Sequence, residues 1–215
     1  LTITLISNVC SLAFLALFFA MRKKNVLAQT YLAKGLPNLA FLPLVLGGMC
    51  LAGFVGILLD MLPIPEHILE EYSQSAQMLG GAGWVAVLSS VVVAPIAEEV
   101  IFRGLVYTRL RRAMPPIVAM LLSSAVFGLL HGQLLWVCYA FFVGLVMAFV
   151  FERTGTVQAT ILLHFAFNLA GSYLLGSVPA SPVLAFAFAA GATACWVWLC
   201  RICPYTKLRP EGGCD

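Results

Sequence analysis

Charged residues are scarce in this sequence. Of its 215 residues only 10% are Asp, Glu, Lys or Arg, whereas 62% are hydrophobic. Soluble domains carry roughly a quarter charged residues, so a water-soluble globular protein is excluded. The net charge of +3 is small and the basic residues are confined to loops, which makes nucleic acid a poor partner. The lipid bilayer is therefore the expected environment of this chain.

We expect neither a disulfide framework nor a cleavable leader. The seven cysteines are scattered, mostly within apolar runs, which argues against a disulfide-stapled fold. Cys200 and Cys203 form a lone CxxC, which we interpret as inert thiols because no second pair accompanies it. Residues 1–20 are apolar, but the basic cluster that begins at Arg22 follows this run instead of preceding it. We therefore expect a retained membrane span there.

Apolar runs of about 20 residues repeat along the chain, and a helix of that length crosses a ~30 Å hydrocarbon core. We predict an all-α, polytopic transmembrane helical bundle of about seven spans, at 1–20, 39–62, 84–110, 116–132, 134–151, 158–176 and 183–203. Segment 63–83 is rich in proline, glycine and acid and is predicted to be an outer loop. The chain then divides into two spans with this loop (1–83), a four-helix core (84–176), and a last span with a tail (177–215).

Lysine and arginine are absent from the loops on one side of this arrangement. With alternating spans, the opposite side collects Arg22, Lys23, Lys24, Lys34, Arg109, Arg111, Arg112, Arg153, Arg201, Lys207 and Arg209. The other side contains only the acids Asp60, Glu66, Glu70 and Glu71. The positive-inside rule therefore places the basic side and the C-terminus in the cytoplasm, and we expect the plasma membrane of a prokaryote. Arg103 is the one basic residue left within a predicted span.

Three ionisable residues lie in the interior of the 84–110 span, where such groups are expensive and therefore suspected of function. Glu98 and Glu99 are adjacent, so they point about 100° apart on a helix and have different neighbours. Glu99 and Arg103 stand at i and i+4 with the acid first, the favourable order for an ion pair. We predict a mainly structural Glu99–Arg103 pair and a freer Glu98, beside a kink at Pro95 that makes room for water.

Two histidines and an asparagine also lie within or at the margin of the predicted spans. His131 ends one span, and His164 and Asn168 share one face of another at i and i+4. Each also has a structural interpretation, as an interfacial histidine or as polar contacts between helices. However, these three residues and Glu98 all lie about 14 to 22 Å from the expected cytoplasmic ends of their helices, at ~1.5 Å per residue. A common depth indicates a shared site.

A glutamate and two histidines can activate water in two ways. In one, Glu98, His131 and His164 hold a divalent metal, most simply zinc, which lowers the pKa of its bound water. In the other, Glu98 is a general base and His131 helps to position the water. His164 and Asn168 would then donate hydrogen bonds to the oxyanion of a tetrahedral intermediate. The two-histidine zinc helix HExxH is absent, and the residues alone leave both mechanisms open.

Three short motifs in the predicted core resemble one family. EEVIFR at 98–103 is similar to the EExxxR motif of the CPBP family of intramembrane proteases, which comprises CAAX proteases and bacteriocin-processing enzymes and is also called the Abi family. FGLLH at 127–131 matches its FxxxH motif, and HFAFN at 164–168 matches its HxxxN motif. The turn at 154–156 resembles one that precedes the last motif. Each motif is weak alone, but three in order on predicted spans are specific.

The resemblance implies an intramembrane metalloendopeptidase of the CAAX-protease type, acting on a peptide or membrane-protein substrate. The implied catalytic residues are Glu98, Glu99, Arg103, His131, His164 and Asn168, and the implied metal ligands are Glu98, His131 and His164. Glu98 would be the principal catalytic glutamate. Zinc is the implied metal, although a metal-free, glutamate-dependent mechanism has also been proposed for the family. Eight spans are common in members, so the presence of a helix before Leu1 stays open, as does the substrate.

Two other functions fit parts of this pattern. A non-catalytic membrane scaffold that regulates a partner, as in bacteriocin immunity, has no need of a buried, unpaired glutamate. A transporter or proton path uses buried glutamate and histidine, but no repeat symmetry or pair of matching broken helices is visible. We therefore favour the protease. Because Glu98 and His164 lie nearer the basic helix ends, we expect the site to open to the cytoplasm or to lipid near that leaflet.

Overall fold

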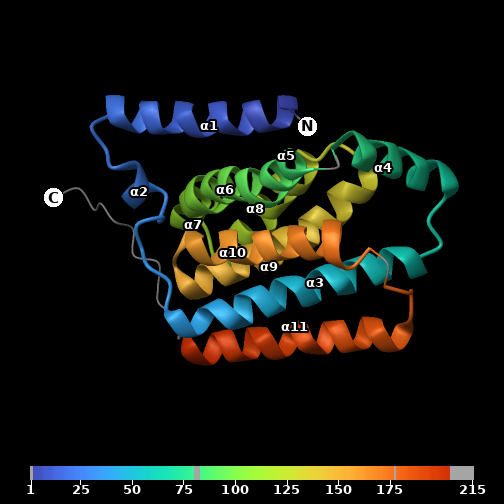
Figure 1. Ribbon diagram of the computed structural model, residues 1–215. Helices are drawn as coiled ribbons and strands as arrows, with labels where there is room; N and C mark the ends of the chain where they lie inside the picture. The colour runs from blue at the N-terminus through green and yellow to red at the C-terminus, as the bar shows by residue number, and fades with distance from the viewer. Residues whose placement is uncertain (1, 80–82, 177, 204–215) are drawn as a thin grey trace.

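The computed structural model describes residues 2–79, 83–176 and 178–203, and within these ranges it contains helices and no strand (Figure 1). The elements are α1 (Thr2–Met21), α2 (Val26–Gln29), η1 (Asn38–Ala40), α3 (Phe41–Met61), α4 (Glu66–Leu79), α5 (Trp84–Val87), η2 (Leu88–Val93), α6 (Ala94–Glu99), η3 (Val100–Tyr107), α7 (Thr108–Ala113), α8 (Pro116–Leu129), α9 (Leu134–Thr154), α10 (Val157–Leu169), η4 (Ala170–Leu174) and α11 (Pro182–Ile202). The predicted all-α polytopic bundle is confirmed. Lys207 and Arg209 lie outside the described residues, as do residues 80–82 of the predicted outer loop.

Each of the seven predicted spans coincides with a long helical segment. Within the described part of the chain, five helices are long and apolar enough to cross a membrane: Thr4–Met21, Asn38–Met61, Trp84–Ala113, Leu134–Thr154 and Pro182–Ile202. α8 is apolar but shorter, and α10 carries His164 and Asn168, two polar residues that lower its hydropathy. The spans predicted at 116–132 and 158–176 are therefore present as helices, and their crossing of the membrane stays a prediction.

Local sequence signals fix the helix ends next to the polar core. Pro116 begins α8, where a missing backbone N–H costs nothing because the first turn of a helix has no acceptor for it. Gly155 ends α9 in the left-handed conformation, with φ 65°, which glycine adopts without strain. The Thr156 hydroxyl then accepts a hydrogen bond from the Gln158 N–H and begins α10. This turn reverses the chain and directs the histidine-bearing helix back through the bundle.

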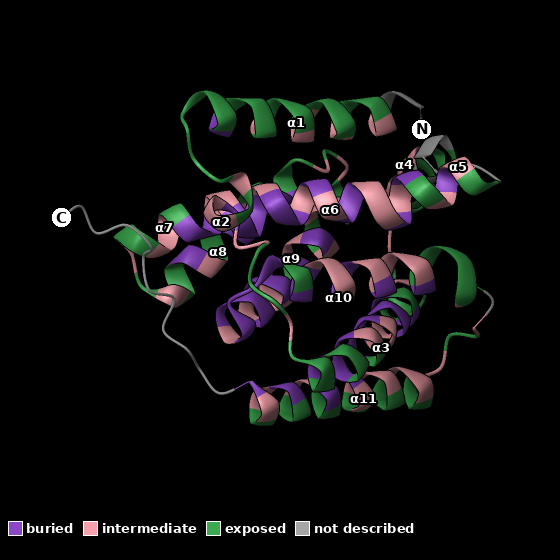
Figure 2. Cartoon of the chain, turned by 60° about the vertical axis from the view of Figure 1, so that its left-hand side comes forward, coloured by how far each residue is buried: buried purple, intermediate pink, exposed green. Residues whose placement is uncertain are grey.

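α1 is packed less closely than the other long helices. It runs along one side of the bundle, and its surface is almost entirely exposed (Figure 2). Only 6% of its candidate span is buried, against 50% for the span that contains α3. An apolar helix with so little protein contact has its surface covered by lipid, because hydrocarbon chains solvate such side chains well.

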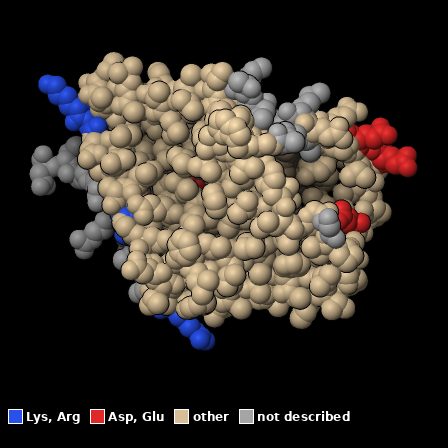
Figure 3. Space-filling view, in the orientation of Figure 1, with Lys and Arg blue, Asp and Glu red and all other residues tan. Residues whose placement is uncertain are grey.

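Charge is separated between the two ends of the bundle. Lys and Arg side chains gather at one end and Asp and Glu at the other, and the belt between them is tan apart from one small recessed red area (Figure 3). The basic end collects the ends of α1 and α7, and the acidic end lies beside α4 (Figure 1). The alternation of spans that the charge pattern required is thus present in three dimensions.

The segment predicted as an outer loop, 63–83, is instead largely a helix, α4. Apolar side chains recur on one of its faces, and these lie against the beginning of α9. The Tyr72 ring stands edge-on to the Trp136 ring at 5.7 Å, and Gln133 donates a hydrogen bond from Nε2 to the Ile68 carbonyl at 3.3 Å. The abundance of glycine, proline and acid concealed this amphipathic pattern, because Pro65 marks the start of the helix and the acids occupy its exposed face.

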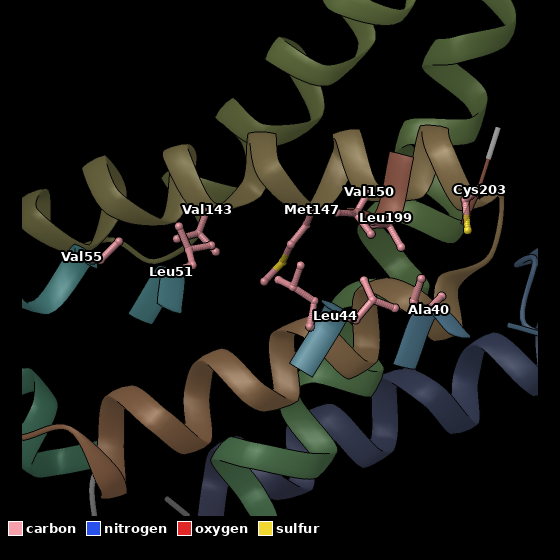
Figure 4. Close-up of a cluster of buried hydrophobic side chains, with 11 residues drawn as sticks. Ala40, Leu44, Leu51, Val55, Val143, Met147, Val150, Leu199 and Cys203 are labelled. Carbon is pink, nitrogen blue, oxygen red and sulfur yellow. The ribbon is translucent and has the colours of Figure 1, made fainter. Parts of the chain in front are cut away.

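α3, α9 and α11 enclose an apolar core (Figure 4). Leu44, Leu51, Met147 and Leu199 are completely or almost completely buried within it. α3 also packs closely against α10: a Cβ added at Gly48 would lie 2.5 Å from the Leu163 carbonyl oxygen. Glycine is therefore required for this approach, which holds α10 in the middle of the bundle.

Candidate active site

The two adjacent glutamates lie on α6, between the π-helical segments η2 and η3. A π turn bonds each N–H to the carbonyl five residues earlier, which widens the helix, and such turns are frequent at functional sites. In η2 the Ala94 N–H donates to the Ser89 carbonyl in this way. Where a kink was predicted at Pro95, the helix stays unbroken from Trp84 to Ala113 and forms η2 just before the proline. The wider turn accommodates a residue that has no N–H to donate.

The predicted ion pair between Glu99 and Arg103 is confirmed. Arg103 Nη1 donates to Glu99 Oε1 at 2.9 Å, and both side chains are buried, with exposed fractions of 1% and 0%. The second arm of the guanidinium, Nη2, donates to the Gly144 carbonyl on α9 at 3.1 Å. Its carbon lies 4.5 Å from the centre of the Phe127 ring on α8, a cation–π contact. Arg103 thus connects the glutamate helix to both α8 and α9.

His164 joins the two glutamates. Its Nδ1 lies 2.9 Å from Glu99 Oε1, and its Nε2 lies 3.8 Å from Glu98 Oε2. Because Glu99 is an ionised acceptor beside Arg103, this bond assigns the imidazole proton to Nδ1 and leaves the Nε2 lone pair directed toward Glu98. Glu98 retains an exposed fraction of 28%, so it is the more accessible carboxylate of the two, as predicted.

His131 approaches the same group of residues from α8. It lies in the turn that follows this helix, and its Nδ1 is 2.9 Å from the Phe127 carbonyl oxygen, which leaves Nε2 directed elsewhere. The Phe127 ring is edge-on to both histidine rings, with centroid distances of 4.9 Å to His131 and 6.2 Å to His164. Phe127 therefore separates the two imidazoles and, together with Arg103, defines one wall of the site.

Asn168 lies one turn after His164 on α10. Its Nδ2 donates a hydrogen bond to the Ser90 carbonyl in η2 at 2.8 Å. The Ser90 hydroxyl in turn lies 3.3 Å from the Tyr173 hydroxyl on η4. The amide group predicted as an oxyanion donor is thus engaged with the backbone of the glutamate helix.

A zinc site was predicted from Glu98, His131 and His164. Glu98 Oε2 and the Nε2 atoms of His131 and His164 are donors of the kind that zinc accepts. Within the described ranges, however, no group of three or more His, Cys, Asp or Glu side chains is arranged to hold a metal ion. The described residues therefore do not fit a three-ligand zinc site in the arrangement observed.

Two comparisons with known proteins cover this part of the chain. Residues 80–170 match the family model described as Type II CAAX prenyl endopeptidase Rce1-like. A protein of Bacillus subtilis (strain 168) named "Putative membrane peptidase YdiL" is 32% identical over 82 residues, which are 38% of this chain and 34% of that protein. This segment, less than half of the chain, is therefore similar to CAAX-type endopeptidases. The match spans about a third of the length of that relative, and no solved structure matches the chain.

The matched segment contains all six residues that the motifs identify, and the structure connects five of them. Arg103, Glu99, His164 and Glu98 form one chain of contacts, and His131 is linked to it through Phe127. Asn168 contacts the same glutamate helix at Ser90, about two turns before Glu98.

Sequence reasoning missed three partners in this site. The Gly144 carbonyl gave no signal, because any residue has one. Phe127 was identified only as the first residue of the FxxxH motif. Its ring contacts with Arg103 and both histidines depend on how α8 packs. Ser90 contributes its backbone carbonyl, which accepts the hydrogen bond from Asn168, and a backbone group gives no signal in the sequence.

Proposed function

We propose that this chain is an intramembrane endopeptidase of the CAAX-protease type that hydrolyses a peptide bond in a membrane-associated protein or peptide. One observation carries the proposal. Arg103 holds Glu99, Glu99 holds His164, and the remaining nitrogen of that imidazole faces a second, accessible carboxylate, Glu98. A carboxylate that orients a histidine toward a reacting group is the arrangement by which hydrolases control proton transfer.

The geometry supports activation of one water molecule between Glu98 and His164. Their facing atoms are 3.8 Å apart, and a water about 2.8 Å from each bridges such a distance. The water oxygen attacks the carbonyl carbon of the peptide while Glu98 accepts a water proton. Glu98 passes this proton to the peptide nitrogen as the C–N bond breaks, and the second proton of the water also goes to that nitrogen. The products are a carboxylate and an ammonium group, and Glu98 is ionised again. His131 offers its Nε2 to position the water.

The surroundings favour a substrate within or beside the membrane. Glu98 lies in the middle of a 30-residue apolar helix, so a water-soluble chain would have to leave water to reach it. We propose a multi-pass integral protein of a prokaryotic plasma membrane whose basic end and C-terminus are cytoplasmic. The gathering of basic side chains at one end of the bundle supports this orientation.

The test compares purified wild-type protein with Glu98→Gln in lipid vesicles on a library of apolar peptides. Glutamine keeps the size of the side chain but is too weak a base to accept the proton, so turnover should fall by about 10² to 10⁴-fold. Glu66→Gln, which alters an acid of α4 far from the core, is the matched control and should cleave like the wild type. Equal cleavage by Glu98→Gln would rule out Glu98 as the base, and a wild-type protein that cleaves no peptide would favour the scaffold.

The same samples test the zinc mechanism. Metal content is measured in the purified protein, and cleavage is measured after chelation and after zinc is returned. Under the mechanism proposed above, chelation leaves the rate unchanged. A rate that is lost with the chelator and restored by zinc would instead assign Glu98, His131 and His164 as metal ligands.

A further inference from the structure

One backbone carbonyl of the glutamate helix is affected by the position of a proline. In the π-helical segment η2, the Ala94 N–H donates to the Ser89 carbonyl, five residues earlier. By the same spacing the Ser90 carbonyl would receive the N–H of residue 95, but residue 95 is proline and has none. A carbonyl without a donor is costly in the apolar interior of a membrane protein, because no water replaces the missing bond.

Asn168 supplies the donor that Pro95 lacks. Its Nδ2 lies 2.8 Å from the Ser90 carbonyl oxygen, a good hydrogen-bond distance. The carboxamide comes from α10, so the bond connects the two helices that carry the proposed catalytic groups. Pro95 is buried, and Asn168 is half-buried, which gives this bond little competition from water.

The bond fixes the offset between those helices. Four residues before Asn168 on the same face of α10, His164 contacts Glu99 and faces Glu98. Two contacts about one helical turn apart determine both the rotation and the height of α10 against the glutamate helix. If the bond to Ser90 were lost, α10 would have freedom to shift, and the 3.8 Å approach of His164 to Glu98 would shift with it.

We infer that Asn168 is a positioning residue, which holds His164 against Glu98 by binding the Ser90 carbonyl that Pro95 leaves without a donor. This inference rests on the proposed protease function for its kinetic consequences. It differs from the role suggested by the motif alone, in which Asn168 donates to the oxyanion of the reaction intermediate.

The decisive experiment is a double-mutant cycle of Asn168→Leu and Pro95→Ala. Alanine at position 95 restores a backbone N–H for the turn, so the Ser90 carbonyl no longer depends on Asn168. Asn168→Leu in the wild-type background should lower kcat/KM by about 10²-fold through misplacement of His164. In the Pro95→Ala background the same change should cost less than about threefold, because the coupling between the two sites is removed.

Two readouts separate this role from the alternatives. The pH profile of kcat/KM reports the ionisation of the groups that act in free enzyme, so a displaced His164 should move its limbs, and Pro95→Ala should move them back. A direct oxyanion contact predicts a lower kcat with an unchanged profile, and a loss that persists in both backgrounds. That second pattern would overturn the inference.

Two further measurements keep the cycle decisive. Thermal unfolding in detergent should show the same non-additivity, with Asn168→Leu destabilising only the protein that retains Pro95, and it needs no activity. It therefore distinguishes failure of this inference from failure of the proposed function. If Asn168→Leu does not purify as folded protein, Asn168→Asp replaces it, since aspartate keeps the shape and loses the donor.

Tyr173→Phe is the matched control for the contacts that Ser90 makes with the helix that carries His164 and with η4. It removes the other hydroxyl contact to residue 90 but leaves the Ser90 carbonyl bound to Asn168. Its pH profile should coincide with that of the wild type. A shift of the pH profile as large as that of Asn168→Leu would show that loss of any contact to Ser90 has this effect. Such a result would contradict a specific role for Asn168.

Discussion

Two of the glutamates that the structure describes are buried, and they are held in different ways. Glu99, in the middle of its helix, bonds to Arg103 and His164, and all three side chains are buried. Glu152, at the end of α9, accepts from the Tyr107 hydroxyl and from Arg111 Nε at 3.1 Å, and Arg111 is 23% exposed. The first network leads to a second carboxylate inside the membrane region, whereas the second leads to the basic end of the protein.

The difference separates a site from a structural connection. A charge at the end of a helix is partly hydrated, so its partners need only hold two helices together. A charge in the middle of the bundle must be neutralised completely, and this forces its partners into fixed positions. The rigidity that Glu99 requires is what directs His164 toward Glu98. Substitutions in the two networks test this difference between Glu99 and Glu152.

Arg103→Ala should have the largest effect. It leaves Glu99 buried without its cation, which should lower the free energy of unfolding by about 3–5 kcal/mol and abolish cleavage. Unfolding is followed in detergent with increasing denaturant. The control is the double variant Glu99→Leu/Arg103→Leu, which removes both charges and should recover most of the stability but none of the activity, because His164 has lost its partner. A stable, fully active Arg103→Ala protein would contradict the role of this pair.

Phe127→Leu should act on the same network less strongly. The change removes a ring that contacts Arg103 and both imidazoles, with a loss of about 2 kcal/mol from the desolvated cation–π contact. Turnover should fall while the affinity for substrate changes little, since the histidines lose a wall and the peptide does not. A change in KM alone would assign Phe127 to substrate binding instead.

Tyr107→Phe tests the second glutamate. It removes the hydroxyl that donates to Glu152, and a hydrogen bond to a charged acceptor contributes about 1.5 kcal/mol. Because Glu152 lies at the end of α9 and Glu98 in the middle of its helix, the variant should unfold at a lower temperature and cleave peptide at the wild-type rate. Loss of activity in a folded Tyr107→Phe protein would connect the two networks and remove the contrast between them.

Arg111→Gln should have the smallest effect. The side chain is partly exposed at the basic end, and such ion pairs contribute about 0.2–1 kcal/mol, which added salt reduces further. Stability measured at low and high salt should therefore converge for wild type and variant. A loss as large as that of Arg103→Ala would mean that the end of the bundle is as dry as its centre.

The side from which the site is reached tests the predicted cytoplasmic opening. Single cysteines placed next to Glu98 and His164 in a cysteine-free background are treated with a membrane-impermeant thiol reagent. Labelling is expected in inverted vesicles and not in intact cells, because the basic end is the nearer one. Labelling from intact cells alone would reverse the assignment.

Composition and the spacing of residues within one helix predict three features of this protein correctly: the membrane environment, the alternation of the helices and the Glu99–Arg103 ion pair. The scarcity of charge requires a membrane environment, and the separation of charge between loops fixed the alternation of the helices. The spacing of Glu99 and Arg103 predicted their ion pair, because the period of a helix places residues i and i+4 side by side whatever surrounds them.

Contacts between residues of different helices are known only from the tertiary structure. Neither the contact of His164 with Glu99 nor the bond from Asn168 to the Ser90 carbonyl follows from any spacing along the chain. Both depend on the rotation and offset of α10, which are set by close packing at Gly48 and by the π-helical turn at Pro95. α4 was missed for a different reason, since the proline, glycine and acid of this segment concealed its amphipathic pattern. Local periodicity fixes geometry within a helix, and packing fixes it between helices.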